Sequence, residues 1–82
     1  MLRFNVKRVK AERIARGITQ ERMAEILGIS RAQYIRKENG KRPIAVDELT
    51  VICDSLKITR EHVLIFFVND VDNRLHVEKE VS

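Results

Sequence analysis

The stretch TQERMAEILGISRAQYIRKENGKR, residues 19–42, decides the fold. Its first half predicts a short helix, because Thr19 is a favourable N-cap and Gly28 is a favourable helix end. Its second half predicts another helix, because Ser30 and Gln33 match the S/T-x-x-E/Q capping box. Two helices joined by so short a turn must cross steeply, and the second one presents its N-terminal end outward.

Apolar residues at helical spacing predict three further helices, which makes five in all. The first lies in FNVKRVKAERIARG (4–17), the fourth in VDELTVICDSLKI (46–58) and the fifth in REHVLIFF (60–67), where Thr59 would be the N-cap. The residues placed on their apolar sides and in the corner between the two central helices are Val6, Val9, Ile14, Ile18, Met23, Ala24, Leu27, Ile29, Tyr34, Val46, Leu49, Ile52, Cys53, Leu56, Val63, Leu64 and Phe67.

The chain is predicted to divide into a helical domain, 1–67, and a C-terminal arm or dimerisation segment, 68–82. In the arm, Leu75, Val77 and Val81 alternate with polar residues, which is typical of a short strand. A frayed tail fits the same composition equally well, so both interpretations stay open at this point.

Length and composition describe one small domain with a single modest core. Of the 82 residues, 44% are hydrophobic and 34% are charged. The single cysteine, Cys53, cannot form an internal disulfide, and no secretion signal is recognisable, so we expect a reducing cytoplasm. The longest apolar run, VLIFFV at 63–68, is too short to span a bilayer.

The net charge of +4 is unevenly distributed along the chain. Residues 1–42 hold twelve Lys or Arg and four Asp or Glu, which gives +8, whereas residues 43–82 hold four and eight, which gives −4. The basic half suits an anionic partner, and nucleic acid is the leading candidate. A basic face that only keeps the protein soluble explains the charge equally well.

No catalytic, metal-binding or cofactor-binding pattern is found in the sequence. His62 and His76 are fourteen residues apart and belong to no zinc-ligand set. There is no G-x-x-x-x-G-K-[ST] phosphate loop, and the serines have no convincing base partner. We therefore expect a protein that is not an enzyme and that needs no metal or cofactor.

In this order and spacing, ITQERMAEILGIS (18–30), SRAQYIRKENGKR (30–42) and VDELTVICDSLKIT (46–59) resemble the DNA-binding domain of phage Cro and lambda repressor, the XRE-like helix-turn-helix family. The resemblance extends from Val9 to Leu64. It implies an all-α, five-helix, lambda-repressor-like domain that binds double-stranded DNA. The expected function is a sequence-specific transcriptional regulator, a repressor that binds a palindromic operator as a homodimer. Because the same fold serves antitoxins and other protein-interaction modules, a regulatory protein partner is the alternative.

The resemblance also implies roles for individual residues. The residues expected to read base edges in the major groove are Arg31, Ala32, Gln33, Ile35 and Arg36. The residues expected to bind backbone phosphates are Gln20, Lys37, Asn39, Lys41 and Arg42. Glu38 is expected to form a structural ion pair with Arg13, and the alternative is an ordinary surface acid among cations.

Several of these assignments have a competing interpretation. The Gln33 side chain is also the capping-box partner expected for the second helix, and Ile35 fits either a thymine methyl group or the hydrophobic corner. Lys37 stands where many family members place an apolar core residue. Ala45 replaces the usual hydroxyl cap of the fourth helix, and Pro43 falls one residue earlier than in the common pattern, so the preceding loop is expected to differ.

Overall fold

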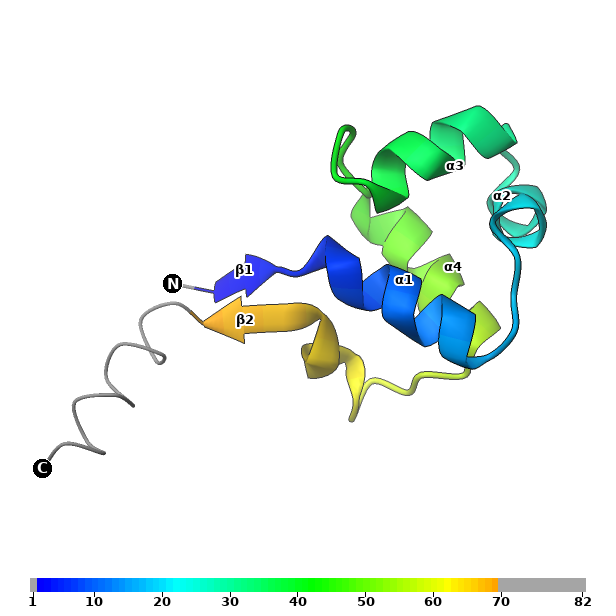
Figure 1. The fold of residues 1–82 in the computed structure, drawn as a ribbon. Helices are drawn as coiled ribbons and strands as arrows, with labels where there is room; N and C mark the ends of the chain where they lie inside the picture. The colour runs from blue at the N-terminus through cyan, green and yellow to red at the C-terminus, as the bar shows by residue number, and fades with distance from the viewer. Residues whose placement is uncertain (1, 70–82) are drawn as a thin grey trace, which may run out of the picture.

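The protein is represented by a computed structural model, in which residues 2–69 are described. Four α-helices pack together, and a two-stranded ribbon extends to one side of them (Figure 1). A 3-10 helix, η1, connects the last α-helix to the ribbon. The elements are β1 (Leu2–Phe4), α1 (Val6–Ala15), α2 (Gln20–Leu27), α3 (Arg31–Glu38), α4 (Val46–Leu56), η1 (Val63–Phe66) and β2 (Phe67–Asn69).

The ends of α2 and α3 are fixed by local hydrogen bonds, as the sequence predicts. The Thr19 hydroxyl accepts a hydrogen bond from the Arg22 amide at 3.0 Å. Gly28 ends α2 in the left-handed region, with φ of 72°. The capping box of α3 is complete, because Ser30 and Gln33 each donate a backbone N–H to the other's side chain, both at 3.1 Å. The steep crossing of α2 and α3 is confirmed (Figure 1).

The core is built from one face of every helix. Ala24 is only 2% exposed, and its small side chain allows α2 to pack closely against its neighbours. Three corner residues, Ile18, Leu27 and Ile29, are half-buried against this core. The largest fully buried side chains are Val9, Met23, Tyr34, Ile52, Leu56 and Phe66.

A fifth α-helix is not formed within residues 2–69. Residues 63–66 make only the 3-10 helix η1, and the chain then enters β2, which pairs antiparallel with β1 in the register Phe4–Phe67. The β-branched and aromatic residues of this segment favour a strand, and β1 provides the partner. The Phe4 ring packs at 5.6 Å from the Phe67 ring and at 6.4 Å from the Phe66 ring. The domain is therefore mostly helical with a small sheet rather than all-α.

Because η1 and β2 replace the predicted fifth helix, the buried side chains of residues 46–67 differ from those predicted. Val46 and Leu64, both placed on apolar faces by the sequence pattern, are 77% and 66% exposed. Phe66 and Ile58 are buried instead. The β2 strand crosses the predicted domain boundary at residue 67, and the predicted strand at 75–81 lies outside the described residues.

The first helix lies within the predicted stretch 4–17. It starts at Val6, after β1 at residues 2–4. Val9 is fully buried, whereas Ile14 is 57% exposed. None of the helices in residues 2–69 has the length and apolar character needed to cross a membrane.

Candidate nucleic-acid interface

One face of α3 is open to solvent and carries most of the residues expected to read bases. Arg31, Ala32, Gln33 and Arg36 are exposed, and Ile35 is half-buried beside them. Tyr34 and Glu38 lie on the opposite face and are buried. The structure therefore brings the five side chains together on one short helix.

The Gln33 side chain has part of its hydrogen-bonding capacity occupied. Its Oε1 atom accepts the Ser30 N–H at 3.1 Å, which is the capping-box bond. The amide nitrogen, which can only donate, is not needed for that bond. With the box intact, Gln33 therefore offers a donor to a ligand and keeps its acceptor for the helix end.

The loop after α3 is folded back onto the end of that helix. The amides of Lys41 and Arg42 donate to the Arg36 carbonyl at 2.8 and 3.3 Å, and the Gly40 amide donates to the Lys37 carbonyl at 3.1 Å. Gly40 adopts φ of 79°, which a residue with a side chain rarely does. These bonds hold the exposed residues 39–42 at a fixed position beside the exposed face of α3.

Four cations of this region remain available to an anionic ligand. They are exposed, and within residues 2–69 none of them has an ion-pair partner. Two of them belong to α3 and two to the loop that follows it. They are Arg31, Arg36, Lys41 and Arg42.

Beneath the exposed face of α3, the Glu38 carboxylate is the centre of a buried hydrogen-bond network. Arg13 donates to both of its oxygens, from Nε at 2.8 Å and from a terminal nitrogen at 3.0 Å. The Tyr34 hydroxyl donates at 2.6 Å and the Gln20 amide at 3.0 Å. Arg13 also donates to the Ile18 carbonyl at 2.6 Å. The network joins α1, the turn before α2, α2 and α3.

The electrostatics of the network around Glu38 follow from these contacts. Burial by itself would raise the pKa of Glu38, but the hydrogen bonds from Arg13, Tyr34 and Gln20 outweigh burial and lower the pKa below its ordinary value of 4.5. The bond to Glu38 raises the pKa of Arg13. Burial and the adjacent carboxylate raise the pKa of Tyr34. The carboxylate and the guanidinium are therefore both charged at neutral pH.

Two members of this network were not predicted from the sequence. Tyr34 precedes Glu38 by one helical turn, and this i, i+4 spacing is a signal that places the two side chains on one face. Gln20 was expected at a DNA phosphate, and the structure shows that its amide donates one hydrogen bond to Glu38. No local pattern connects it to a residue eighteen positions later.

The candidate interface lies in a part of the chain that is similar to a known family. The sequence matches the helix-turn-helix family of the Cro and lambda-repressor type over residues 9–63, which is more than half of the chain. The chain belongs to this family. Searches of curated proteins and of solved structures found no significant match.

Membership of the helix-turn-helix family makes the protein a DNA-binding transcription regulator, and α2 and α3 are its two motif helices. The family is generally not enzymatic. Within residues 2–69, no group of three or more His, Cys, Asp or Glu side chains could hold a metal ion. Cys53 is buried in the core, where burial raises the pKa of its thiol.

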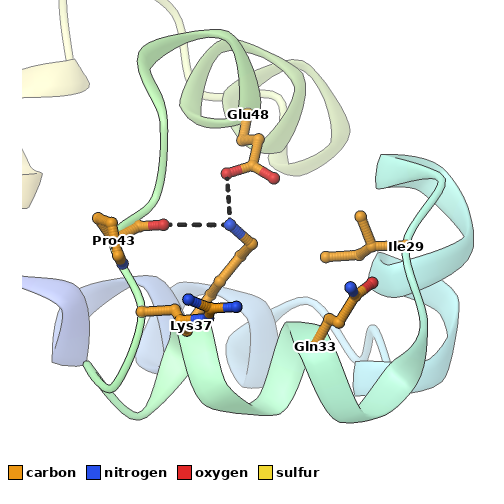
Figure 2. A pocket seen from close by; sticks show the side chains of 6 residues that line it. Ile29, Gln33, Lys37, Pro43 and Glu48 are labelled. Atoms are coloured by element: carbon orange, nitrogen blue, oxygen red, sulfur yellow. Dashed lines mark hydrogen bonds and ion pairs between the residues drawn. The ribbon is translucent and has the colours of Figure 1, made fainter.

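Lys37, the least family-like position of the motif, has a partner within the protein. Its ammonium group lies 3.0 Å from Glu48 Oε1 and donates to the Pro43 carbonyl at 3.1 Å (Figure 2). The same Glu48 oxygen accepts the Ala45 amide at 2.9 Å. This bond is the half of a capping box that needs no side-chain acceptor at position 45. This bond and the lysine lower the pKa of Glu48. Lys37 thus links α3 to the start of α4.

Proposed function

We propose that this helix-turn-helix protein is a sequence-specific repressor that binds a palindromic operator as a homodimer. The observation that carries the proposal is the combination of an exposed, capped α3 with an adjacent loop of unpaired cations. A short exposed helix with Arg31 in its first turn and Arg36 in its last turn suits the major groove, where arginine can donate two hydrogen bonds to guanine. A bound dimer would block access of the polymerase to the same DNA.

In this proposal the residues have two kinds of contact. Base edges are read by side chains of α3, which are Arg31, Ala32, Gln33, Ile35 and Arg36. Ile35 is half-buried beside these residues, and its accessible part supports contact with a thymine methyl group. Backbone phosphates are bound mainly from the loop after α3, by Asn39, Lys41 and Arg42. These contacts provide affinity and orientation without reading the sequence.

The two remaining residues of the expected phosphate set have partners inside the protein. The Gln20 amide donates to Glu38, and one N–H of that amide is left to reach a phosphate near the start of α2. We therefore keep Gln20 as a phosphate contact. Lys37 is held by Glu48 and by a backbone carbonyl, so we leave it out of the phosphate-binding set.

Dimerisation is supported by an apolar groove beside α4. The groove lies between α4 and β2, has a volume of about 430 Å³ and includes Val46, Leu49, Val63 and Phe67 in its lining. A contiguous apolar surface on a small protein commonly marks a protein contact. Two copies joined there would present their α3 helices to half-sites about 34 Å apart, one turn of duplex. The expectation that residues 68–82 contribute to the dimer stays a prediction.

The same groove favours the second candidate function, a protein-interaction module such as an antitoxin. This function predicts that binding depends on the groove residues and is indifferent to Arg31 and Arg36. The repressor function predicts the reverse for DNA. The two functions are therefore separated by the same pair of arginine substitutions.

Selection of bound sequences from random duplex DNA at physiological salt tests the proposal. We expect a palindromic consensus with half-sites one turn apart, and sedimentation of the complex as two protein chains per duplex. A protein that enriches no sequence, while it binds random duplex, would not be a sequence-specific regulator.

A further inference from the structure

Lys37 differs from the other two cations of α3 because it forms an ion pair with Glu48. Arg31 and Arg36 are exposed, but the side chains of Lys37 and Glu48 are only 20% and 22% exposed. Both residues line a cavity of about 270 Å³ between α3 and the start of α4 (Figure 2). Gln33 and Arg42 line the same cavity, so it adjoins both parts of the candidate interface.

Two hydrogen bonds hold Lys37 in this position. They go to the Pro43 carbonyl and to Glu48, at 3.1 and 3.0 Å. Glu48 is itself fixed by the Ala45 amide, at 2.9 Å. The carboxylate is therefore tied to the first turn of α4 and cannot follow the lysine if the lysine turns outward.

We propose that Glu48 limits the sequence-independent affinity of this protein for DNA by withholding Lys37 from the DNA backbone. The inference rests on the proposed function, in which α3 and the loop after it face the duplex. A lysine whose charge is neutralised at 3.0 Å by a fixed carboxylate releases no counterion from DNA. A lysine freed from that carboxylate has a flexible four-carbon arm, with which it can reach a phosphate beside the cavity.

An additional phosphate contact would favour every duplex equally, because phosphates carry no sequence information. It would strengthen binding to random DNA and to the operator alike, and so raise affinity without adding discrimination. Pairing Lys37 with Glu48 avoids this effect and keeps the phosphate contacts in the loop after α3. Glu48 is in this sense a positioning residue that does not touch DNA.

The test is the salt dependence of binding for Glu48→Gln, which removes the charge but keeps an oxygen for the Ala45 amide. We expect tighter binding to random duplex. The slope of log K against log[salt] should become steeper by about 0.9, the value for one more neutralised phosphate. The gain should therefore shrink about 3.5-fold between 50 and 200 mM salt.

Asp47→Asn is the matched control. Asp47 lies in the same first turn of α4 and is exposed, and its substitution changes the net charge by the same amount. It should leave the slope unchanged. The double variant Lys37→Met with Glu48→Gln should lose the gain of Glu48→Gln. Lys37→Met alone should leave the slope at its wild-type value.

Two outcomes would overturn the inference while leaving the proposed function intact. One is equal slopes for Glu48→Gln and Asp47→Asn, in which case Lys37 is not withheld. The other is a slope shallower by about 0.9 in Lys37→Met, which would mean that Lys37 already binds a phosphate. A wild-type protein that selects no sequence contradicts the proposed function instead, and the slopes on random duplex still decide the role of Glu48. Absence of any DNA binding at 50 mM salt overturns both.

Discussion

Replacement of Glu38 by alanine should destabilise the domain more than any surface substitution. Glu38 accepts four hydrogen bonds at 2.6–3.0 Å, and the residue is 3% exposed. Arg13 is 7% exposed, and Glu38→Ala leaves its guanidinium with the Ile18 carbonyl as its remaining acceptor. It also removes the acceptor of the buried Tyr34 hydroxyl. Removing one member of a buried ion pair typically costs about 3–5 kcal/mol.

This magnitude is large for so small a chain. At about 0.05–0.15 kcal/mol per residue, 82 residues give a total free energy of unfolding of about 4–12 kcal/mol. A loss of about 3 kcal/mol should lower the melting temperature by about 12–24 °C. Urea unfolding followed by circular dichroism at pH 7 measures the free energy directly.

The exposed pair between Arg22 and Glu25 provides the control. Their side chains are 65% and 63% exposed and approach to 3.5 Å, so Glu25→Ala should change the free energy of unfolding by less than about 1 kcal/mol. The buried pair should also be coupled. Arg13→Met combined with Glu38→Gln should be more stable than Glu38→Gln alone, because it removes the uncompensated guanidinium. Equal losses for Glu38→Ala and Glu25→Ala, or simple additivity in the double variant, would refute this reasoning.

Three further predictions concern the pH dependence of the Glu38 network, the role of Gln33, and the exposed cations of the candidate interface. The pKa of Glu38 is lowered in the folded state, so the ionised carboxylate stabilises the fold above pH 4.5, and this stabilisation is lost as the pH falls through the lowered pKa. The difference in free energy of unfolding between wild type and Glu38→Gln, measured in urea, should therefore shrink below pH 4.5. Gln33→Glu keeps the capping box and should alter stability by less than about 0.5 kcal/mol, yet it replaces a donor by an acceptor. Sequence selection should then show a preference shifted toward cytosine at one base pair, whereas uniform weakening would place this side chain at a phosphate. Arg31→Ala and Arg36→Ala should each reduce discrimination between operator and random duplex by about 1–3 kcal/mol, and Lys41→Ala should weaken both duplexes alike, as competition binding at several salt concentrations would measure.

The helix-turn-helix could be predicted from the sequence because its signals are local. Thr19, Gly28 and the Ser30–Gln33 box each act within one helical turn, and the structure has all of them. The pairing of Arg13 with Glu38 was available only through the family resemblance, since 25 residues separate the two. The exposed face of α3 followed from the same resemblance together with helical spacing.

The two-stranded ribbon could not be predicted in this way. Its strands have three residues each, and Phe4 pairs with Phe67 from the other end of the described chain. A three-residue strand gives almost no alternation to recognise, and the helical spacing of Val63, Leu64 and Phe67 favoured the wrong structure. The partner strand decides the outcome, because it provides hydrogen bonds and ring contacts that an isolated segment lacks.

The charge distribution also has a different meaning in the folded protein. The excess of +8 in residues 1–42 is a count along the chain, whereas a ligand meets only charges that have no partner. Arg8 and Arg16 are paired with Glu12, and Arg13 is paired with Glu38. Lys37 is paired with Glu48, which belongs to the acidic half of the sequence.

Pairing therefore decides how many cations can contact a duplex and where they lie. The cations that remain at α3 and its following loop are Arg31, Arg36, Lys41 and Arg42. The first two lie on the helix proposed to read bases and the last two on the loop proposed to bind phosphates, so the discriminating charges and the non-discriminating charges stand on different elements. A substitution that frees Lys37 adds a non-discriminating charge to the reading helix itself. For this reason the acid at position 48, which touches no DNA in this proposal, should influence how tightly the protein binds DNA of any sequence, whereas the arginines should influence which sequence it binds.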